Sequence, residues 1–292
     1  MSDFYGLPTR SIANAHMRLD FLAQAGPRLV RLVLANSTDN LLAEAPDVHW
    51  PTPFGEYYLR GGHRVTVAPE ALELAYVPDN TGLIIEELQD GVRLIEPAAG
   101  PGISKSIEIR LDPQRPALTL RHVVCNERSV PIELAVWSIT LLPPGGIAVA
   151  PLRARQGGRR HQPDRQLVLW PYTSWQDARL FADDDYVWID AQPDGEELKV
   201  GLLTRGWLGY LRAGVFFLKR FDPQLELLHP DYNTNAQVYS NRQYLELESL
   251  APLSRLEPGQ SSVHLETWEI YRDVPVPQTI EGLSEWIASL RL

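Results

Sequence analysis

The sequence predicts an all-β protein made of sheets packed face to face, and three observations lead to this fold class. Roughly fifteen or more short apolar segments are separated by turn signals every 8–12 residues or so, which is typical of β sandwiches. The 292 residues include 24 prolines and 20 glycines, which favour turns over long helices. Only the extreme C-terminus, Thr279 to Leu290, repeats apolar residues at helical spacing. We therefore expect one β domain, residues 1–292, with a short C-terminal helix.

Composition and charge narrow the class of protein. With 44% hydrophobic and 22% charged residues, the chain can bury a sizeable core. A net charge of -10 argues against nucleic acid as a partner. The one cysteine, Cys125, excludes an internal disulfide and a cysteine-based zinc cluster, and its apolar neighbours predict a core position. We see no signal peptide and no apolar run of about 18 residues, so we expect a cytoplasmic protein without a membrane partner.

One late segment alternates strictly between polar and apolar residues. From Tyr244 to Glu248 it reads YLELE, so Glu246 and Glu248 share a face with Tyr244 and stand about 7 Å apart along the strand. A turn at Pro258-Gly259 and a second strand, Ser262 to Arg272, follow. Two acids side by side on one strand face indicate either a solvated surface or a polar site.

Two further patterns predict strand pairs. Asp90-Gly91 lies between two apolar segments and favours a hairpin. The segments Leu118 to Val124 and Pro131 to Leu142 give the clearest strand pair, joined by a short polar turn. His122 falls on the apolar face of the first segment, which favours a core histidine over a ligand.

Glycines and arginines mark two candidate binding segments. Gly61-Gly62 precedes His63 and Arg64, which indicates either a glycine turn with solvated side chains or a binding element. The basic run Arg153 to His161 is either a solvated loop or part of a groove for an anionic ligand.

Phosphate and metal motifs fail on spacing. Gly100 to Ser106 lacks the glycine spacing of a phosphate loop, and Asp183 to Asp185 lacks the spacing and distal glutamate of a calcium loop. We expect no metal and no cofactor.

Several segments, in order along nearly the whole chain, resemble the galactose mutarotase-like (aldose 1-epimerase-like) superfamily, and in particular a poorly characterised bacterial branch of it. The resemblance implies the β-supersandwich fold of that superfamily. The matching segments are LDFLAQAGPRLVRLVLANSTDNLL, GGHRVTVAPE, NERSVPIELAVWSITLLPPGG, KVGLLTRGW, HPDYN and YLELESLAPLSRLEPGQSSVHLETW.

The resemblance also implies a site. In such mutarotases a carboxylate near the C-terminus is the general base on the anomeric hydroxyl. Glu246 and Glu248 both occupy the matching strand, so the resemblance leaves the two as alternatives for the base, with Glu248 narrowly favoured. Related epimerases place an arginine near the sugar at the glycine-pair element, which carries over to Arg64 and His63. The family's acid histidine is missing, because the corresponding segment reads Ala135 to Thr140 without a histidine. His63 would have to supply that proton.

Three functions follow as hypotheses. The first is a carbohydrate-active isomerase of the aldose 1-epimerase type. The second is a sugar-binding module without turnover, and the third is a lyase or hydrolase acting on an acidic saccharide. In each the expected partner is a small-molecule carbohydrate. The residues expected to contact it are Arg64, Trp137, Lys199, Trp207, Lys219, Tyr232 and Asn235, with Trp170 and Trp175 as further aromatic candidates.

Overall fold

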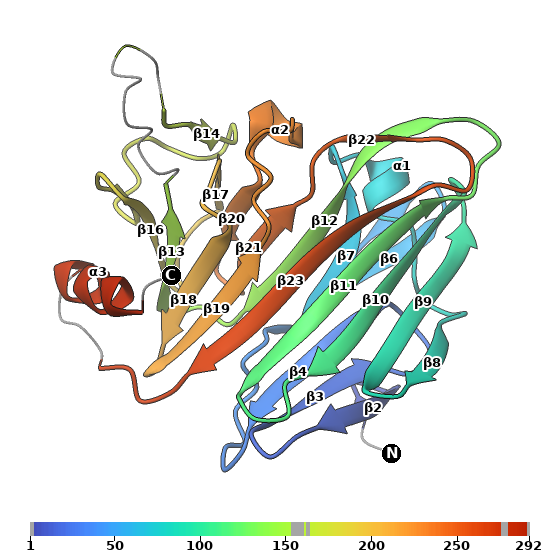
Figure 1. Cartoon of the computed structure of the whole chain (residues 1–292), viewed down its shortest axis with the longest axis horizontal. Helices are drawn as coiled ribbons and strands as arrows, with labels where there is room; N and C mark the ends of the chain where they lie inside the picture. Colours follow the sequence, from blue (N-terminus) through green and yellow to red (C-terminus); the bar gives the residue numbers. More distant parts are fainter. Residues whose placement is uncertain (1–2, 153–160, 162–163, 276–279, 291–292) are drawn as a thin grey trace.

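Two large antiparallel sheets dominate the fold (Figure 1). The computed structural model describes residues 3–152, 161, 164–275 and 280–290. The first sheet has eleven strands. In spatial order they are β1 (Asp3–Phe4), β2 (Leu7–Ala13), β3 (Met17–Leu22), β4 (Arg28–Leu34), β7 (His63–Ala68), β12 (Ile132–Leu142), β21 (Leu245–Leu250), β20 (Ala236–Ser240), β17 (Leu198–Leu202) and β14 (Leu167–Leu169), with β22 (Ser254–Leu256) paired to β12.

The second sheet has ten strands, and a separate two-stranded hairpin completes the strand set of the described chain. In spatial order the second sheet contains β15 (Leu180–Ala182), β16 (Tyr186–Ala191), β13 (Gly146–Pro151), β18 (Trp207–Arg212), β19 (Val215–Phe221), β23 (Ser261–Tyr271), β11 (Ala117–Asn126), β10 (Ile103–Leu111), β9 (Gly91–Ala99) and β8 (Ile84–Leu88). The hairpin joins β5 (Glu44–Thr52) to β6 (Gly55–Gly61). The helices are α1 (Leu72–Ala75), α2 (Pro230–Asn233) and α3 (Ile280–Ser289).

The core between the sheets follows from strand alternation. Leu245 and Leu247 of β21 are fully buried in one continuous cluster with Leu118 and Leu120 of β11, from the other sheet. A second cluster covers the opposite face of the first sheet, where Trp137 packs with residues of β6 and α1. The first sheet is therefore buried on both faces around β12. This explains why β12 is buried along almost its whole length and shows no simple alternation of buried and exposed residues.

The predicted all-β fold is confirmed, and so are several elements. The hairpin at Asp90-Gly91 joins β8 to β9 with Leu88 opposite Gly91. The C-terminal helix α3 forms and buries Leu283 and Ile287 against the outer face of the second sheet. Figure 1 shows α3 outside the sandwich, beside β13, β16 and β18.

Two expectations about the central strands were wrong. β11 and β12 do not pair with each other, because β11 lies between β10 and β23 in one sheet and β12 lies between β7 and β21 in the other. The short turn after Asn126 carries the chain across the sandwich, and each strand finds partners that are distant in sequence. Cys125 is only partly buried, because alternation turns it away from the core that holds Val124.

No helix among the described residues is long and apolar enough to span a membrane.

Candidate active site

A polar cavity of about 260 Å³ lies on the face of the first sheet that points away from the second sheet. Strands β7, β12, β17, β20 and β21 supply its floor, because alternation brings one set of their side chains to this face. The cavity is smaller than the several hundred cubic ångströms of a drug-sized site, which fits a ligand of about one sugar ring. Its lining residues are Trp50, Leu59, Arg64, Glu70, Tyr76, Trp137, Tyr172, Glu197, Lys199, Tyr239, Tyr244 and Glu246.

The two glutamates of β21 occupy different positions. Glu246 lines the cavity, whereas Glu248 is fully buried behind the lining. Burial raises the pKa of Glu246 to about 7, Arg64 opposes the rise, and the neighbouring Glu248 adds to it. A carboxyl group that titrates near neutral pH can both take and return a proton. The structure therefore distinguishes two residues that the sequence left as alternatives.

Glu248 holds Lys199 in place. Its Oε2 accepts hydrogen bonds from Lys199 Nζ at 3.0 Å and from Trp137 Nε1 at 2.8 Å. The ammonium also lies 4.9 Å from the Trp137 ring centroid and 4.8 Å from that of Trp170, so two indoles flank it. Burial raises the pKa of Glu248 and Lys199 opposes this rise. Lys199 is thus a fixed cation in the wall of the cavity.

Arg64 is a buried cation, and some of its hydrogen-bond donors have no partner among the described residues. Its side chain is 5% exposed, and Nη1 lies 3.6 Å from Glu246 Oε1, which is too long for a good hydrogen bond. Both Nε and Nη1 lack a hydrogen-bond partner among the described residues. Buried donors without partners are costly, so Arg64 is prepared for oxygen atoms of a ligand.

Two further carboxylates stand in the exposed part of the lining, each beside a tyrosine. The Tyr76 hydroxyl donates to Glu70 Oε1, and the Tyr239 hydroxyl donates to Glu197 Oε1 at 2.8 Å. Both glutamates are exposed. They had not been predicted as site residues, although Glu197 and Lys199 share a strand face by simple alternation. Glu70 and Tyr76 carry no comparable signal, because the loop around α1 brings them to the cavity.

The structure does not bring His63 to this cavity. Successive residues of β7 point to opposite faces, so Arg64 faces the cavity and His63 is fully buried between the two sheets. There its Nε2 lies 2.8 Å from Nε2 of His122, and its Nδ1 lies 2.9 Å from Thr140 Oγ1. The core position predicted for His122 is confirmed.

The protons of this histidine pair can be assigned from its partners. A carbonyl oxygen only accepts, so the contact of 3.1 Å between His122 Nδ1 and the His264 carbonyl places the proton on Nδ1. Burial lowers the pKa of His122 to about 4, which leaves the ring neutral and its Nε2 an acceptor. His63 Nε2 therefore donates to His122, and His63 Nδ1 accepts from Thr140.

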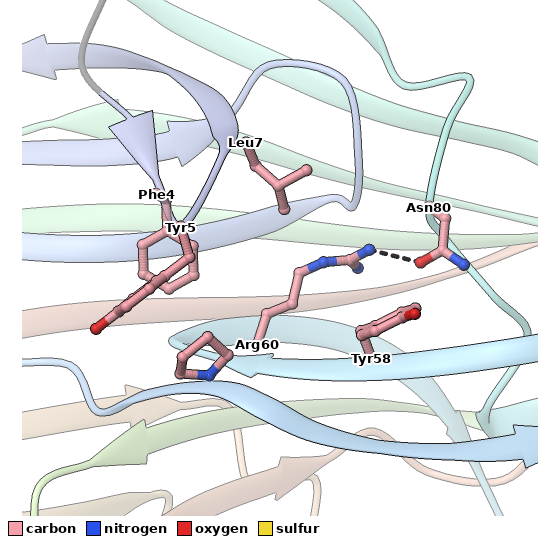
Figure 2. Close-up of a pocket in the computed structure, with 7 residues that line it drawn as sticks. Phe4, Tyr5, Leu7, Tyr58, Arg60 and Asn80 are labelled. Carbon is pink, nitrogen blue, oxygen red and sulfur yellow. Dashed lines mark hydrogen bonds between the residues drawn. The ribbon is translucent and has the colours of Figure 1, made fainter.

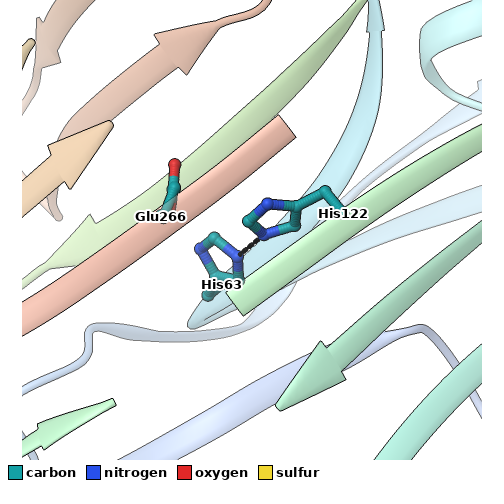
Figure 3. A group of neighbouring side chains, drawn as sticks. All are labelled: His63, His122 and Glu266. Atoms are coloured by element: carbon teal, nitrogen blue, oxygen red, sulfur yellow. Dashed lines mark hydrogen bonds between the residues drawn. The ribbon is translucent and has the colours of Figure 1, made fainter. Parts of the chain in front are cut away.

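Three of the buried groups have the composition of a metal site. His63, His122 and Glu266 bring their ligand atoms within 4.8 Å of one another (Figure 3). However, Lys219 Nζ lies 2.9 Å from Glu266 Oε1, and Trp268 Nε1 donates to Glu266 Oε2 at 3.0 Å. Both imidazoles also have complete sets of partners. The ammonium of Lys219 and the ring protons satisfy the group, so its polar atoms do not require a cation.

The remaining predicted contact residues are distributed over the molecule. Arg64, Trp137 and Lys199 meet at the cavity together with Glu246. Lys219 is in the buried network just described. Trp207 packs beneath α3 on the outer face of the second sheet.

Two predicted contacts lie near α2. Tyr232 is 86% exposed. Asn235 is buried, and its Oδ1 accepts from the Thr204 backbone N–H at 2.7 Å. Trp175 is exposed as well. Apart from His161, the basic run from Arg153 to His161 lies outside the described residues.

A second cavity, of about 370 Å³, lies near the N-terminus between β1, β2 and β6. Figure 2 shows Arg60 pointing into it, with its Nη2 bonded to Asn80 Oδ1 at 2.5 Å. Arg60 Nη1 also bonds Asp79 at 2.6 Å. The surface here is mostly apolar and contains no carboxylate, so it offers no acid–base pair.

Solved structures with the same fold support the predicted resemblance. A galactose mutarotase-like protein from Lactobacillus casei matches with a TM-score of 0.60 and 9% identity, over 90% of this chain and 100% of that one. A candidate aldose 1-epimerase from Escherichia coli K12 matches with a TM-score of 0.56 and 12% identity, over 91% and 100%. A galactose mutarotase related enzyme from Lactobacillus acidophilus matches with a TM-score of 0.53 and 9% identity, over 92% and 99%.

No family model and no curated protein matches the sequence. At these identities the likeness shows the fold alone. The chain has the galactose mutarotase-like fold, as the resemblance of its segments implied.

Proposed function

We propose that the cavity binds a monosaccharide and interconverts its anomers, with Glu246 as the general base. One observation carries the proposal: Glu246 lines a cavity of about one sugar ring, and burial raises its pKa to about 7. A base works best when its pKa lies near the working pH. The fold shared with mutarotase-like proteins supports a sugar as the ligand.

The reaction requires two proton transfers. Glu246 takes the proton of the anomeric hydroxyl while an acid protonates the ring oxygen, the ring opens to the aldehyde, and closure on the other carbonyl face returns both protons. We assign the acid to Lys199, whose ammonium is fixed by Glu248 at 3.0 Å in the same cavity wall. This assignment replaces His63, which faces the other side of the sheet.

The other lining groups orient the ring. The unpartnered donors of Arg64 can bind sugar hydroxyls, and the faces of Trp50, Tyr172 and Tyr244 offer platforms for the sugar CH groups. Glu246 itself is held beside Arg64.

A second candidate function is sugar binding without turnover. It is favoured by one observation, namely that no histidine lines the cavity in the described chain. In that case the acidic and basic side chains only hold hydroxyl groups.

Anomer exchange measured by NMR on a panel of aldoses tests the proposal. Wild type should accelerate exchange of at least one aldose, and Glu246→Gln should lower that rate about 10²- to 10³-fold, as expected for loss of a general base. Glu133→Gln, at an exposed position outside the cavity, is the control and should retain the rate. Sugar-dependent chemical shifts without any acceleration would establish the binding module instead, and an absence of both would refute a sugar site.

A further inference from the structure

The cavity contains more carboxylates than cations. Glu248 is paired with Lys199, and Glu246 lies beside Arg64. Glu70 and Glu197 have no cationic side chain within salt-bridge distance in the described part of the chain. Each accepts one hydrogen bond from a tyrosine hydroxyl and keeps further acceptor sites.

The carboxylates converge on one region. Burial raises the pKa of Tyr172, and Glu248, Glu70, Glu197 and Glu246 all add to this rise, so each of them is close enough to affect the same phenol. Tyr172 lines the cavity and is half exposed. The rings of Tyr76 and Tyr239 line the same cavity, and their hydroxyl groups bond two of the acids. Aromatic faces beside carboxylates are the surroundings that bind ammonium groups.

Arg64 supplies a second, independent sign of a ligand site in the same cavity. It is more than nine-tenths buried and has two donors without partners. The neighbouring Glu246 balances the positive charge of Arg64. The free donors of Arg64 therefore suit the neutral hydroxyl groups of a sugar ring. A ligand that reaches Arg64 with its hydroxyls extends its other end toward the exposed acids.

We propose, on the basis of the function proposed above, that the site selects an aldose bearing a free amino group, whose ammonium lies near Glu70 and Glu197 and the tyrosines beside them. Sugar phosphates and uronates are disfavoured, because they bring a negative charge to a region that already holds uncompensated carboxylates.

Binding of glucosamine, glucose, glucuronate and glucose 6-phosphate, measured by calorimetry at mildly acidic pH, tests the inference. Glucosamine should bind about fivefold or more tightly than glucose, the gain expected from one or two partly exposed charge pairs. Raising the ionic strength from about 0.05 M to about 0.5 M should remove most of this advantage. Galactosamine and galactose form a second pair, in case the site prefers the other epimer.

Variants separate this charge effect from sugar binding itself. Glu70→Gln and Glu197→Gln should each lower the preference for the amino sugar, measured as the ratio of the glucosamine affinity to the glucose affinity of the same variant. Matched controls are Glu73→Gln and Glu196→Gln, at exposed positions outside the cavity, the second ion-paired with Arg242. They should leave the preference unchanged.

The outcomes are distinguishable. Equal binding of glucosamine and glucose, or tighter binding of glucuronate or the phosphate, overturns the inference while leaving the sugar site intact. If none of these sugars binds, the proposed sugar site itself is refuted, and the inference that rests on it is refuted with it.

Discussion

At the level of single residues, alternation along one strand decides which side chains share the cavity face of the sheet. The YLELE pattern of β21 was sufficient to predict that Glu246 and Glu248 share a face, and the structure has them so. Which of them meets the cavity depends on the residues that cover the sheet, and Lys199 and Trp137 enclose Glu248 alone. No local pattern in β21 contains that information.

The pH dependence of anomer exchange follows from Glu246. Only the ionised carboxylate takes a proton, and burial raises the pKa of this group to about 7. The rate should therefore rise with pH, with half of the increase near pH 7, and level off above it. NMR exchange rates across about pH 5.5 to 8.5 measure this profile. A profile that is flat, or that has its midpoint near the ordinary glutamate pKa, would contradict the role of Glu246.

At the level of elements, strands were easier to predict than their partners. The hairpin of β8 and β9 is local, and two turn residues specify it. The partners of β12 are β7 and β21, which are distant in sequence, so hydrophobic alternation reveals the strand but not its neighbours. For the same reason the sequence did not reveal that His63 faces the core and not the cavity. Its neighbour Arg64 shares its sequence context, but the two side chains lie on opposite faces of one strand.

The C-terminal helix α3 should contribute measurably to stability. Leu283 is fully buried against the outer face of the second sheet, in a cluster with Trp207 and Phe216. Leu283→Ala leaves a cavity there and should lower the free energy of unfolding by about 2–5 kcal/mol. Urea denaturation measures the change. The exposed neighbour Glu285 provides the control, since Glu285→Ala should alter stability by less than about 0.5 kcal/mol. A loss for Leu283→Ala no larger than that of the control would show that α3 is not docked.

At the level of the whole molecule, polar groups buried between the sheets link stability to pH. Burial lowers the pKa of His122 to about 4 and that of His264 to about 3, and it also lowers the pKa of His63. The resemblance suggested a catalytic role for His63, but its hydrogen bonds join it to His122 and Thr140 inside the core. Sequence reasoning placed His122 correctly because it lies on an apolar strand face.

His122 makes the folded protein less stable in acid. An unfolded histidine titrates near pH 6.5 and the folded one near 4, so between these values the unfolded state binds more protons. The folded state therefore loses stability as the pH falls through this window, by up to about 1.4 kcal/mol per pH unit. Glu246 and Glu96, whose pKa values burial raises to about 7, act in the opposite direction. The pH dependence of the total free energy of unfolding therefore contains both effects. The difference in this free energy between wild type and a His122 variant isolates the contribution of His122.

His122→Asn should accordingly destabilise the protein most at neutral pH. At pH 7 the variant loses the buried hydrogen bonds of the imidazole, at a cost of about 1–3 kcal/mol. As the pH falls from about 6.5 to 4, wild type alone bears the cost of keeping His122 neutral, so the gap between the two proteins should narrow by up to about 3 kcal/mol. Urea unfolding at several pH values measures the difference in the free energy of unfolding between the variant and wild type. The control His161→Asn, at an exposed position, should not differ from wild type. A gap for His122→Asn that is constant or widens with acid would mean that His122 is protonated in the folded protein, and the proton assignment for the pair with His63 would be wrong.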